Sequence, residues 1–323
     1  MAKVCISIPT RNRPNYVKAT LQSVLVQTFG DFRIIVSDDA SERTASAAVK
    51  EYIHELNDPR IGYVYHSNNL KEFAHGRFLF AQCTEEFFTI LHDDDMWEPS
   101  FLGRAIAILT NDDSLACVTT NQFIIDQNGN RPLGLTQKYR KRTGKDSYPE
   151  GRLYILEPFL THGFFTLSST VFRTAALIRS SLVDPEYEGN FNFDINLFFR
   201  LGERNEVAYY LPEPLAAYRI HSSAISATWA TGYNASVVET FMSMFEKRRF
   251  SGRAEQERRR NLSSAYHNYA IICYFKKDIR GMYHYLRKCI RENPLGWKNW
   301  GYCVLILFFP FLIRPIFNKR VIL

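Results

Sequence analysis

The strongest constraint on the fold is an alternation, over the first 230 residues, of short β-rich runs with segments of helical periodicity. Helical spacing places Val17, Leu21 and Val24 on one face of the first such segment, and Val49 and Ile53 on one face of the second. This alternation is typical of an α/β domain with a mostly parallel sheet. The predicted strands are residues 4–9, 32–37, 61–67 and 87–92.

Acidic residues follow two of the predicted strands directly. Asp38 and Asp39 come after residues 32–37, and the triplet Asp93, Asp94 and Asp95 comes after residues 87–92. In open α/β sheets, ligands bind outside the carboxyl ends of the strands. We therefore expect both acidic groups to lie at the ligand-binding edge.

Three adjacent carboxylates repel one another, so the triplet needs either a cation or a structural role. As a structural role, Asp93 to Asp95 can cap a helix near Ser100 or form a solvated turn. As a metal site, they suit Mg²⁺ or Mn²⁺, which takes one or two carboxylates and fills its other positions with phosphate oxygens and water. Three carboxylates in a row, directly after a predicted strand, favour a metal–diphosphate site over a structural role. No Walker-type glycine-rich loop or GxGxxG stands near the first helix, which argues against P-loop nucleotidases and dinucleotide dehydrogenases.

Composition and cysteine spacing limit the class of protein. With 323 residues, 46% of them hydrophobic, the chain can bury a full core and is expected to carry one large domain and an appendage. The six cysteines form no close pair in the sequence, which argues against a zinc cluster or a disulfide framework and suits a reducing cytosol. The first residues, MAKVCISIPTRNRP, contain no long apolar core, so no secretory signal is expected.

The net charge of +7 is unevenly distributed. Residues 231–323 contain 17 Lys and Arg against 6 Asp and Glu, which leaves 23 against 27 for residues 1–230. A basic segment of this kind suits either nucleic acid or an anionic bilayer. Because the basic clusters are not interleaved with a recognisable nucleic-acid-reading motif, we expect no nucleic-acid partner.

Three segments of the chain resemble the motifs of family-two glycosyltransferases. They are SIPTRNRPNYVKATLQSVLVQTFGDFRIIVSDDAS (7–41), FFTILHDDDMWEP (87–99) and FNFDINLFFRLGERNEVAYYLPEPLAAYRIHSSAIS (191–226). The resemblance covers roughly residues 3–226, with the motifs in the family's order. It implies a GT-A domain, which is a Rossmann-like three-layer α/β fold, and inverting transfer of a sugar from a nucleotide-diphosphate-sugar donor, most simply a UDP-sugar.

The resemblance also assigns the donor side of the site. Asp39 resembles the carboxylate that accepts a hydrogen bond from the donor's base, with Thr10 and Arg11 on the neighbouring loop; turn formation competes as the role of Asp38 and, less so, of Asp39. Asp93 resembles the ribose-contacting residue. Asp94 resembles the ligand of Mn²⁺ or Mg²⁺, and Asp95 either ligates or supports it.

The base for the incoming hydroxyl is assigned in the same way. Inversion needs a base opposite the leaving group, and Asp194 is the candidate, with capping of the following helix as its alternative role. Family members often have Glu before this Asp, whereas this chain has Phe193. The missing Glu leaves Asp194 as the candidate base, but it removes a nearby charge that would tune the pKa of that base.

Further positions belong to the metal and acceptor sides. His221 resembles the histidine that completes the metal or diphosphate shell, and a hydrogen-bonded structural histidine is the alternative. Ser168 and Ser169 resemble acceptor-side residues, although hydrogen bonding within a sheet explains them equally well. The family commonly has Tyr at the position of Arg11 and Gly at that of Ala40, which concerns the contacts to the donor base. Residues 131–153 show little periodicity and are expected to form a loop, either solvated or acting as a lid.

The C-terminal third has a different character. Residues 255–294 resemble a single tetratricopeptide-like helix pair, which must pack on another surface to bury its apolar face. The apolar stretch Tyr302–Ile313 has 12 residues, too few for a confident span of a membrane core that needs ~20. Flanking Trp and basic residues favour an interfacial anchor over a buried helix. The expected domains are 1–228 (GT-A), 229–295 (helical extension) and 296–323 (tail).

The sequence therefore predicts a metal-dependent, inverting glycosyltransferase on the cytoplasmic face of a membrane, extending a glycan or a lipid-linked acceptor in surface polysaccharide synthesis. Two alternatives remain open. A sugar-phosphate nucleotidyltransferase would also use clustered carboxylates and a metal. A non-catalytic scaffold of a glycan-assembly complex would use the helix pair and the tail.

Overall fold

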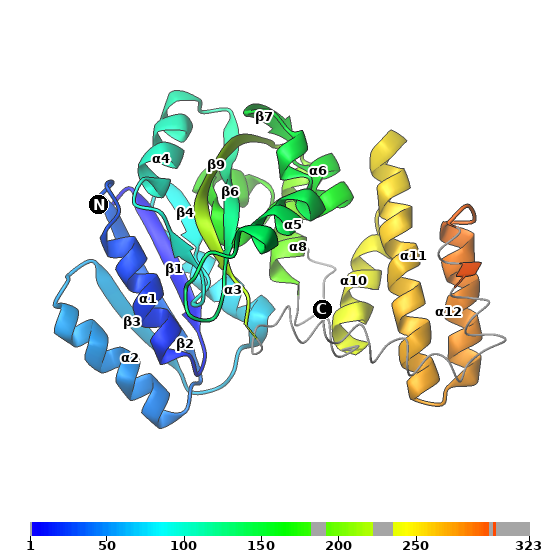
Figure 1. Ribbon diagram of the computed structural model, residues 1–323, viewed down its shortest axis with the longest axis horizontal. Coiled ribbons are helices and arrows are strands. Elements are labelled where there is room, and N and C mark those ends of the chain that lie inside the picture. Colours follow the sequence, from blue (N-terminus) through cyan, green and yellow to red (C-terminus); the bar gives the residue numbers. More distant parts are fainter. Residues whose placement is uncertain (1, 182–191, 222–234, 297–299, 302–323) are drawn as a thin grey trace. The chain divides into compact units, whose positions relative to one another are not determined.

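The computed structural model describes residues 2–181, 192–221, 235–296 and 300–301 (Figure 1). The chain divides into two compact units, Met1–Ile220 and His221–Leu323, and each is described by itself. The boundary predicted at residue 228 and the apolar stretch 302–313 lie outside the described residues.

The first unit is built on one mixed sheet in the order β3-β2-β1-β4-β8-β6-β9-β5, with β7 pairing with β9. Six strands run in one direction, because β1, β2, β3 and β4 are mutually parallel and β6 and β9 run the same way; β5, β7 and β8 oppose them. The strands are β1 (Val4–Thr10), β2 (Phe32–Asp39), β3 (Ile61–His66), β4 (Phe87–Ile90), β5 (Met96–Trp97), β6 (Leu115–Ile125), β7 (Gly151–Tyr154), β8 (Thr170–Arg173) and β9 (Val207–Arg219).

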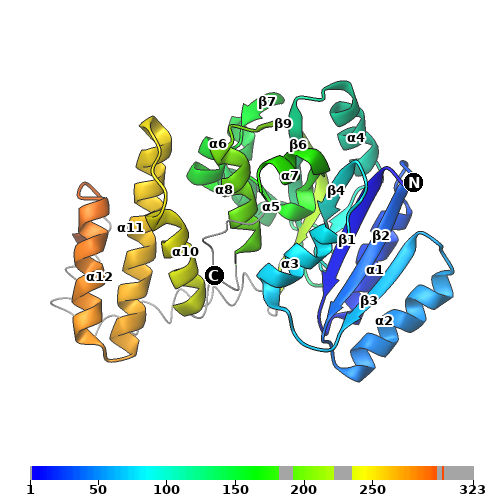
Figure 2. The same ribbon diagram turned by 180° about the vertical axis from the view of Figure 1, so that it is seen from behind.

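Helices cover both faces of this sheet, which gives three layers (Figures 1 and 2). On one face, Val17 and Leu21 of α1 and Leu102 of α4 pack with Ile6 and Ile8 of β1. The other core joins α3, α7 and α8 to the opposite sides of the same strands. The helices of this unit are α1 (Pro14–Leu25), α2 (Arg43–Leu56), α3 (Lys71–Ala81), α4 (Phe101–Asn111), α5 (Leu133–Thr143), α6 (Leu156–His162), α7 (Thr174–Arg179) and α8 (Phe193–Glu203), with 3-10 turns η1 (Lys145–Ser147) and η2 (Leu167–Ser169).

The prediction of a mostly parallel, three-layer α/β domain is confirmed. Each of the four predicted strands forms within two residues of its expected bounds, and β2 continues through Asp38 and Asp39. Alternation along β1 explains the two cores, because Ile6 and Ile8 point to one face and Cys5 to the other.

The prediction of a loop over residues 131–153 is wrong. Residues 133–143 form α5, which ends at Gly144 with a φ of 64°. The helix is held against β6, since Tyr139 donates a hydrogen bond to Gln122 Oε1 (2.9 Å) and Thr136 accepts one from the backbone of Ile124 (2.9 Å). Packing against the sheet therefore stabilises a helix whose own apolar periodicity is weak.

The described part of the second unit contains α10 (Ala235–Glu246), α11 (Gly252–Phe275) and α12 (Ile279–Glu292). α11 and α12 are antiparallel, because Ser263 donates to the carbonyl of Cys289 while the rings of Tyr269 and Tyr285 meet edge to face. Asp278 caps α12 by accepting a bond from the Gly281 N–H at 2.9 Å. Two helices thus form where the helix pair is predicted; its likeness to a tetratricopeptide stays a prediction.

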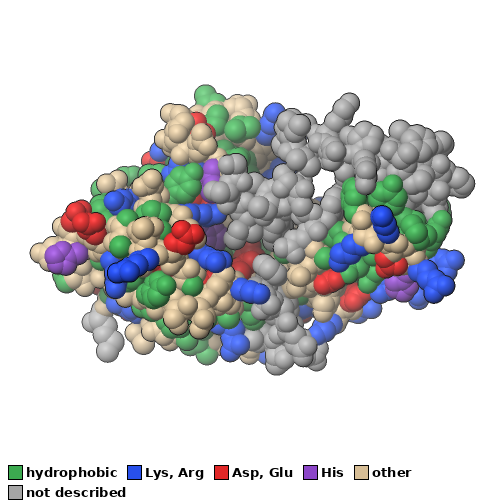
Figure 3. All heavy atoms as spheres, turned by 90° about the horizontal axis from the view of Figure 1, so that it is seen from below, with side chains coloured by type: hydrophobic (Ala, Val, Ile, Leu, Met, Phe, Trp, Pro, Cys, Tyr) green, Lys and Arg blue, Asp and Glu red, His purple; other side chains and the backbone are tan. Residues whose placement is uncertain are grey.

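Two surface properties bear on partners. Among the described residues, no helix combines the length and the hydropathy needed to cross a membrane. On the face drawn in Figure 3, Lys and Arg side chains lie among acidic and apolar ones, and no broad field of one charge covers the described atoms of that face.

Candidate functional site

The candidate site lies where the parallel strands β1, β2 and β4 end. Thr10, the last residue of β1, is in register with Asp38 of β2, and Asp93 follows β4 by three positions. The hydroxyl of Thr10 donates to Asp93 Oδ2 at 2.8 Å. The topology therefore brings the two acidic groups and the end of β1 to one edge of the sheet.

Asp93 is buried and held from two sides. Besides Thr10, Arg13 Nη1 contacts Asp93 Oδ1 at 3.1 Å and Asp94 Oδ2 at 2.9 Å. Burial, and then the charge of Asp94, raise the pKa of Asp93 to about 6, while Arg13 opposes the rise. Arg13 is thus the cation that balances the first two carboxylates.

The backbone of the triplet is fixed by α1. The hydroxyl of Thr20 lies 2.8 Å from the carbonyl oxygens of both Asp93 and Asp95. Thr20 is fully buried on the face of α1 that packs on the sheet. The turn after β4 is therefore anchored before any ligand binds.

Asp95 is the most buried carboxylate of the triplet, at 1% exposure. Its Oδ1 accepts a hydrogen bond from the Arg219 N–H at 3.0 Å, and Arg219 Nε donates to the Asp94 carbonyl at 2.7 Å. Its Oδ2 is buried and has no hydrogen-bond partner among the described residues. Burial and the charge of Asp94 raise the pKa of Asp95 to about 7. A buried carboxylate oxygen of this kind needs a proton or a cation.

The residues present fit a divalent cation. Donor atoms of His92, Asp94 and Asp95 all lie within 4.8 Å of one another, and His92 Nδ1 is 3.9 Å from the unbonded Asp95 Oδ2. Two carboxylates and an imidazole form a donor set that Mn²⁺ accepts, and oxygens alone suit Mg²⁺. The sequence analysis did not predict His92 as a ligand. Its position directly before the triplet, with an imidazole that can bind a metal, was the signal that pointed to it.

Asp38 and Asp39 have different surroundings at the end of β2. Asp38 is fully buried; its Oδ1 accepts the Ser41 N–H at 2.8 Å and its Oδ2 the Tyr63 hydroxyl at 2.7 Å. These bonds match the turn-forming role considered for Asp38. Asp39 instead accepts backbone N–H groups at the start of α3, from Leu70 at 2.6 Å and Lys71 at 3.2 Å. Its carboxylate thus caps α3 from a neighbouring strand.

Asp194 lies in the first turn of α8 and is half-buried. Burial raises the pKa of Asp194, as a general base requires. Glu72 of α3 is its electrostatic neighbour: burial, and then the charge of Asp194, raise the pKa of Glu72 to about 7. The positive charge of a protonated His92 would lower the pKa of both Glu72 and Asp194. No sequence signal links Glu72 to Asp194, because they are 122 positions apart.

The remaining predicted residues are placed less directly. Arg11 is exposed, and the nearby Arg13 makes the contacts to the triplet. Ser168 is buried and accepts a bond from the His92 N–H at 3.2 Å, whereas the Ser169 hydroxyl bonds to that of Thr166, just before the turn η2, at 2.7 Å. His221 is buried two positions after the end of β9 and is the first residue of the second unit.

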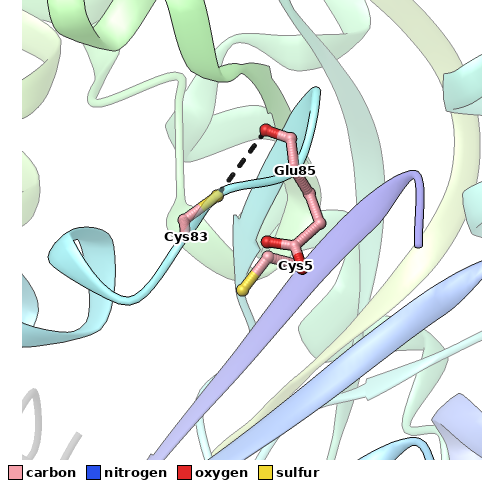
Figure 4. Close-up of side chains that lie close together, drawn as sticks. All are labelled: Cys5, Cys83 and Glu85. Carbon is pink, nitrogen blue, oxygen red and sulfur yellow. Dashed lines mark hydrogen bonds between the residues drawn. The ribbon is translucent and has the colours of Figure 1, made fainter. Parts of the chain in front are cut away.

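A second group of metal-ligand types lies at the opposite edge of the sheet. Cys5 near the start of β1, Cys83 after α3 and Glu85 before β4 have donor atoms within 4.8 Å of one another (Figure 4). Cysteines far apart in the sequence thus meet in the fold. However, Arg33 holds both carboxylate oxygens of Glu85, at 2.7 and 2.9 Å, which neutralises that ligand. The group ties the α3–β4 turn to β1 and β2.

Solved structures share this fold. TarS 1-349 from Staphylococcus aureus, in complex with UDP-GlcNAc, aligns over 90% of this chain and 81% of its own with a TM-score of 0.63 and 15% identity. A mannosyltransferase from Pyrobaculum calidifontis, in complex with GDP-Man and Mn²⁺, aligns over 99% and 85% with a TM-score of 0.58 and 14% identity. At these identities the likeness concerns the fold, which is that of GT-A glycosyltransferases.

Sequence comparisons give the family. A putative colanic acid biosynthesis glycosyl transferase, WcaA of Escherichia coli, is 25% identical over 60% of this chain and 64% of its own. A Campylobacter jejuni protein named GalNAc(5)-diNAcBac-PP-undecaprenol beta-1,3-glucosyltransferase is 27% identical over 68% and 65%. The chain thus matches just under two thirds of the length of each of these relatives. Since the model described as glycosyl transferase family 2 matches residues 5–176, more than half of the chain, the protein belongs to that family.

Proposed function

We propose that the protein is an inverting, divalent-metal-dependent glycosyltransferase that moves a sugar from a nucleotide-diphosphate-sugar to a hydroxyl of a glycan or lipid-linked acceptor. The observation that carries the proposal is the meeting of Thr10, Arg13 and the Asp93–Asp95 triplet at the carboxyl edge of the sheet. Membership of the family supports the transfer reaction. A UDP-sugar is the first donor to test, because TarS is solved with UDP-GlcNAc; GDP-Man, the ligand of the Pyrobaculum enzyme, is the second.

The donor's nucleoside would lie between the ends of β1 and β2. Asp39 offers a carboxylate to the base, and Thr10 and Asp93 offer oxygen atoms to the ribose; Arg11 and Asp38 flank this pocket. Asp93 keeps the position through its two bonds to Thr10 and Arg13. Arg13 also provides positive charge for phosphate oxygens, once the triplet is neutralised in another way.

Asp94 and Asp95 would hold Mn²⁺ or Mg²⁺, with His92 or His221 as the nitrogen ligand. The bound ion supplies Lewis-acid stabilisation of the negative charge on the departing diphosphate. Thr20 and Arg219 hold the backbone that carries these ligands, through the carbonyls of Asp93, Asp94 and Asp95. These contacts would hold the proposed ligands in place before the ion binds.

Asp194 would accept the proton of the acceptor hydroxyl. Burial makes its carboxylate more basic than that of an exposed aspartate, and the first turn of α8 fixes it on a regular element. Ser168, and less directly Ser169, would line the acceptor side. Because base and leaving group act on opposite sides of the sugar carbon, the transfer inverts its configuration.

A membrane-linked acceptor would require the protein to work at a membrane surface. The Campylobacter relative is named for an undecaprenol-linked substrate, and the basic excess of this chain lies in residues 231–323. We therefore place the protein on the cytoplasmic face of the membrane, held by its residues 296–323, with residues 1–228 as the GT-A domain and 229–295 as the helical extension. Surface polysaccharide synthesis is the corresponding process.

The test is donor binding and turnover by the full-length chain. Calorimetry with UDP- and GDP-sugars, in Mn²⁺, in Mg²⁺ and in chelator, should show binding of one nucleotide class that needs the metal. Asp94→Asn should abolish that binding, Asp194→Asn should retain it but lose transfer, and Asp113→Asn, at a 92% exposed side chain, should change neither. Absence of donor binding by the folded protein would favour the scaffold, and turnover of nucleoside triphosphate would favour the nucleotidyltransferase.

A further inference from the structure

The first turn of α3 contacts both halves of the proposed site. On one side, Asp39 accepts the backbone N–H groups of Leu70 and Lys71, at 2.6 and 3.2 Å. On the other side, Glu72 Oε1 accepts the backbone N–H of Phe193 at 3.0 Å. Leu70, which precedes α3, and the first two residues of α3 thus connect the donor-base carboxylate to the start of α8.

This turn has a defined and unusual conformation. Lys71 has a φ of 64°, in the left-handed region that non-glycine residues seldom adopt, and its N–H and that of Leu70 both donate to Asp39. Packing adds to the bonds. A Cβ atom at Gly76 would lie 2.6 Å from the ring of Phe193, and the rings of Phe73 and Phe193 meet edge to face at 6.1 Å between centroids. The start of α8 is therefore closely seated on α3.

Asp194 immediately follows the residue that Glu72 binds. The N–H groups of a helix's first turn have no partner within the helix, and a carboxylate there both accepts their hydrogen bonds and favours the positive end of the helix dipole. Glu72 meets this need from a different helix. Within α8, the carboxylate of Asp194 accepts the N–H of Ile195 at 2.7 Å, and the N–H of Phe193 is the one that Glu72 accepts.

We propose that Glu72 is a positioning residue for the base Asp194, and that it acts by fixing the first turn of α8 through the Phe193 N–H. This inference rests on the proposed function for the role of Asp194. Because the same turn of α3 is fixed by Asp39, the donor pocket and the base share one support. If the first turn of α8 were displaced, the donor site would still form, but Asp194 would lie too far from the acceptor hydroxyl to accept its proton.

Two substitutions separate hydrogen bonding from charge. Glu72→Ala removes the acceptor, and Glu72→Gln keeps an amide oxygen that can accept the same N–H. We expect kcat for transfer to fall about 10- to 100-fold in the alanine variant, the scale of a misplaced catalytic group, and to stay within about 3-fold of wild type in the glutamine variant. The donor KM should stay within about 2-fold in both variants.

A structural readout accompanies the kinetics and does not depend on turnover. Amide hydrogen exchange in residues 193–199 should accelerate in Glu72→Ala and stay near wild type in Glu72→Gln. Asp112→Ala is the matched control, because Asp112 also accepts a backbone N–H, from Ser114 at 3.0 Å, but precedes β6 at the opposite edge of the sheet. It should change neither kcat nor exchange in α8.

The outcomes separate this inference from the proposed function. Equal loss of kcat in the alanine and glutamine variants would overturn positioning through the hydrogen bond, as would unchanged exchange in α8 or a donor KM that rises as much as kcat falls. Full activity of Asp194→Asn would instead overturn the assignment of the base. An alanine variant that fails to fold leaves the glutamine variant decisive, since its loss of kcat alone refutes the inference.

Discussion

Lys145 is fully buried in the first unit, and the cost of this burial can be measured. Its ammonium group donates to the Thr120 carbonyl at 2.7 Å and lies 5.4 Å from the centre of the Phe164 ring. Burial lowers the pKa of Lys145 from 10.5 to about 7. That difference corresponds to about 5 kcal/mol of lost stability wherever both states are protonated.

The sign of the pH dependence follows from proton counts. Below pH 7 both folded and unfolded chains hold the proton, so the cost is full and constant. Between about pH 7 and 10.5 the unfolded chain holds it and the folded chain does not, so this group makes stability rise with pH. Lys145→Met removes the titration and forfeits one hydrogen bond, at about 1–3 kcal/mol.

We therefore expect Lys145→Met to be more stable than wild type by about 2 kcal/mol at pH 7 and less stable at pH 10. The difference between the two proteins should change by about 3 kcal/mol over that range. Urea unfolding at several pH values measures it, and titrations common to both proteins cancel. Lys138→Met, at an exposed position on α5, is the control and should show no such change. A difference that stays constant from pH 7 to 10 would refute the buried, uncompensated charge.

Three further predictions concern the site. Since burial raises the pKa of Asp95 to about 7, the folded chain holds a proton that the unfolded chain releases above roughly pH 4, and metal-free stability falls as the pH rises through this window. Asp95→Asn should therefore stabilise the metal-free protein at pH 8 by up to about 4 kcal/mol and abolish stabilisation by Mn²⁺; an unchanged melting temperature in chelator would contradict this. Arg13→Gln leaves Asp93 and Asp94 without their guanidinium partner and should lower the free energy of unfolding by about 1–3 kcal/mol in chelator. In thermal melts, adding Mn²⁺ should raise the melting temperature of this variant more than it raises that of wild type. Gly76→Ala places a Cβ 2.6 Å from the Phe193 ring and should cost about 1–3 kcal/mol in urea unfolding, with part of the loss restored by adding Phe193→Leu; full stability of the single variant would show that the two helices separate easily.

Two clusters of possible metal ligands can be compared in this fold: the group of Cys5, Cys83 and Glu85, and the carboxylate triplet. Whether such a cluster can bind a metal depends on the groups that surround it. Glu85 is bound through both oxygens by Arg33, so its charge is already balanced. Asp95 Oδ2 is buried without a hydrogen-bond partner among the described residues, and its neighbours in the triplet are also acidic. Donor atoms at similar distances therefore differ in their surroundings: at one edge of the sheet the carboxylate is already neutralised by Arg33, whereas at the other Asp95 keeps a buried oxygen that needs a proton or a cation.

The sequence by itself determined the fold class, the first strands and the edge at which the site lies. Strand and helix periodicities differ, and parallel strands all end at one edge, so the acidic residues at the end of β2 and those after β4 had to lie at the same edge. Local pattern also sufficed for α11 and α12, whose turn and cap lie between two periodic segments. It failed for α5, because contacts of Tyr139 and Thr136 with β6 decide that helix.

Only the tertiary structure decided which charged groups act on which. Arg13, two positions beyond the predicted Arg11, binds the triplet because the turn after β1 directs its side chain there. Glu72 meets Phe193 across 121 positions, and Cys5 meets Cys83 across 78. Such pairs follow from the packing of α3 and α8 on one face of the sheet, and packing depends on side-chain shape throughout the core rather than on any local pattern.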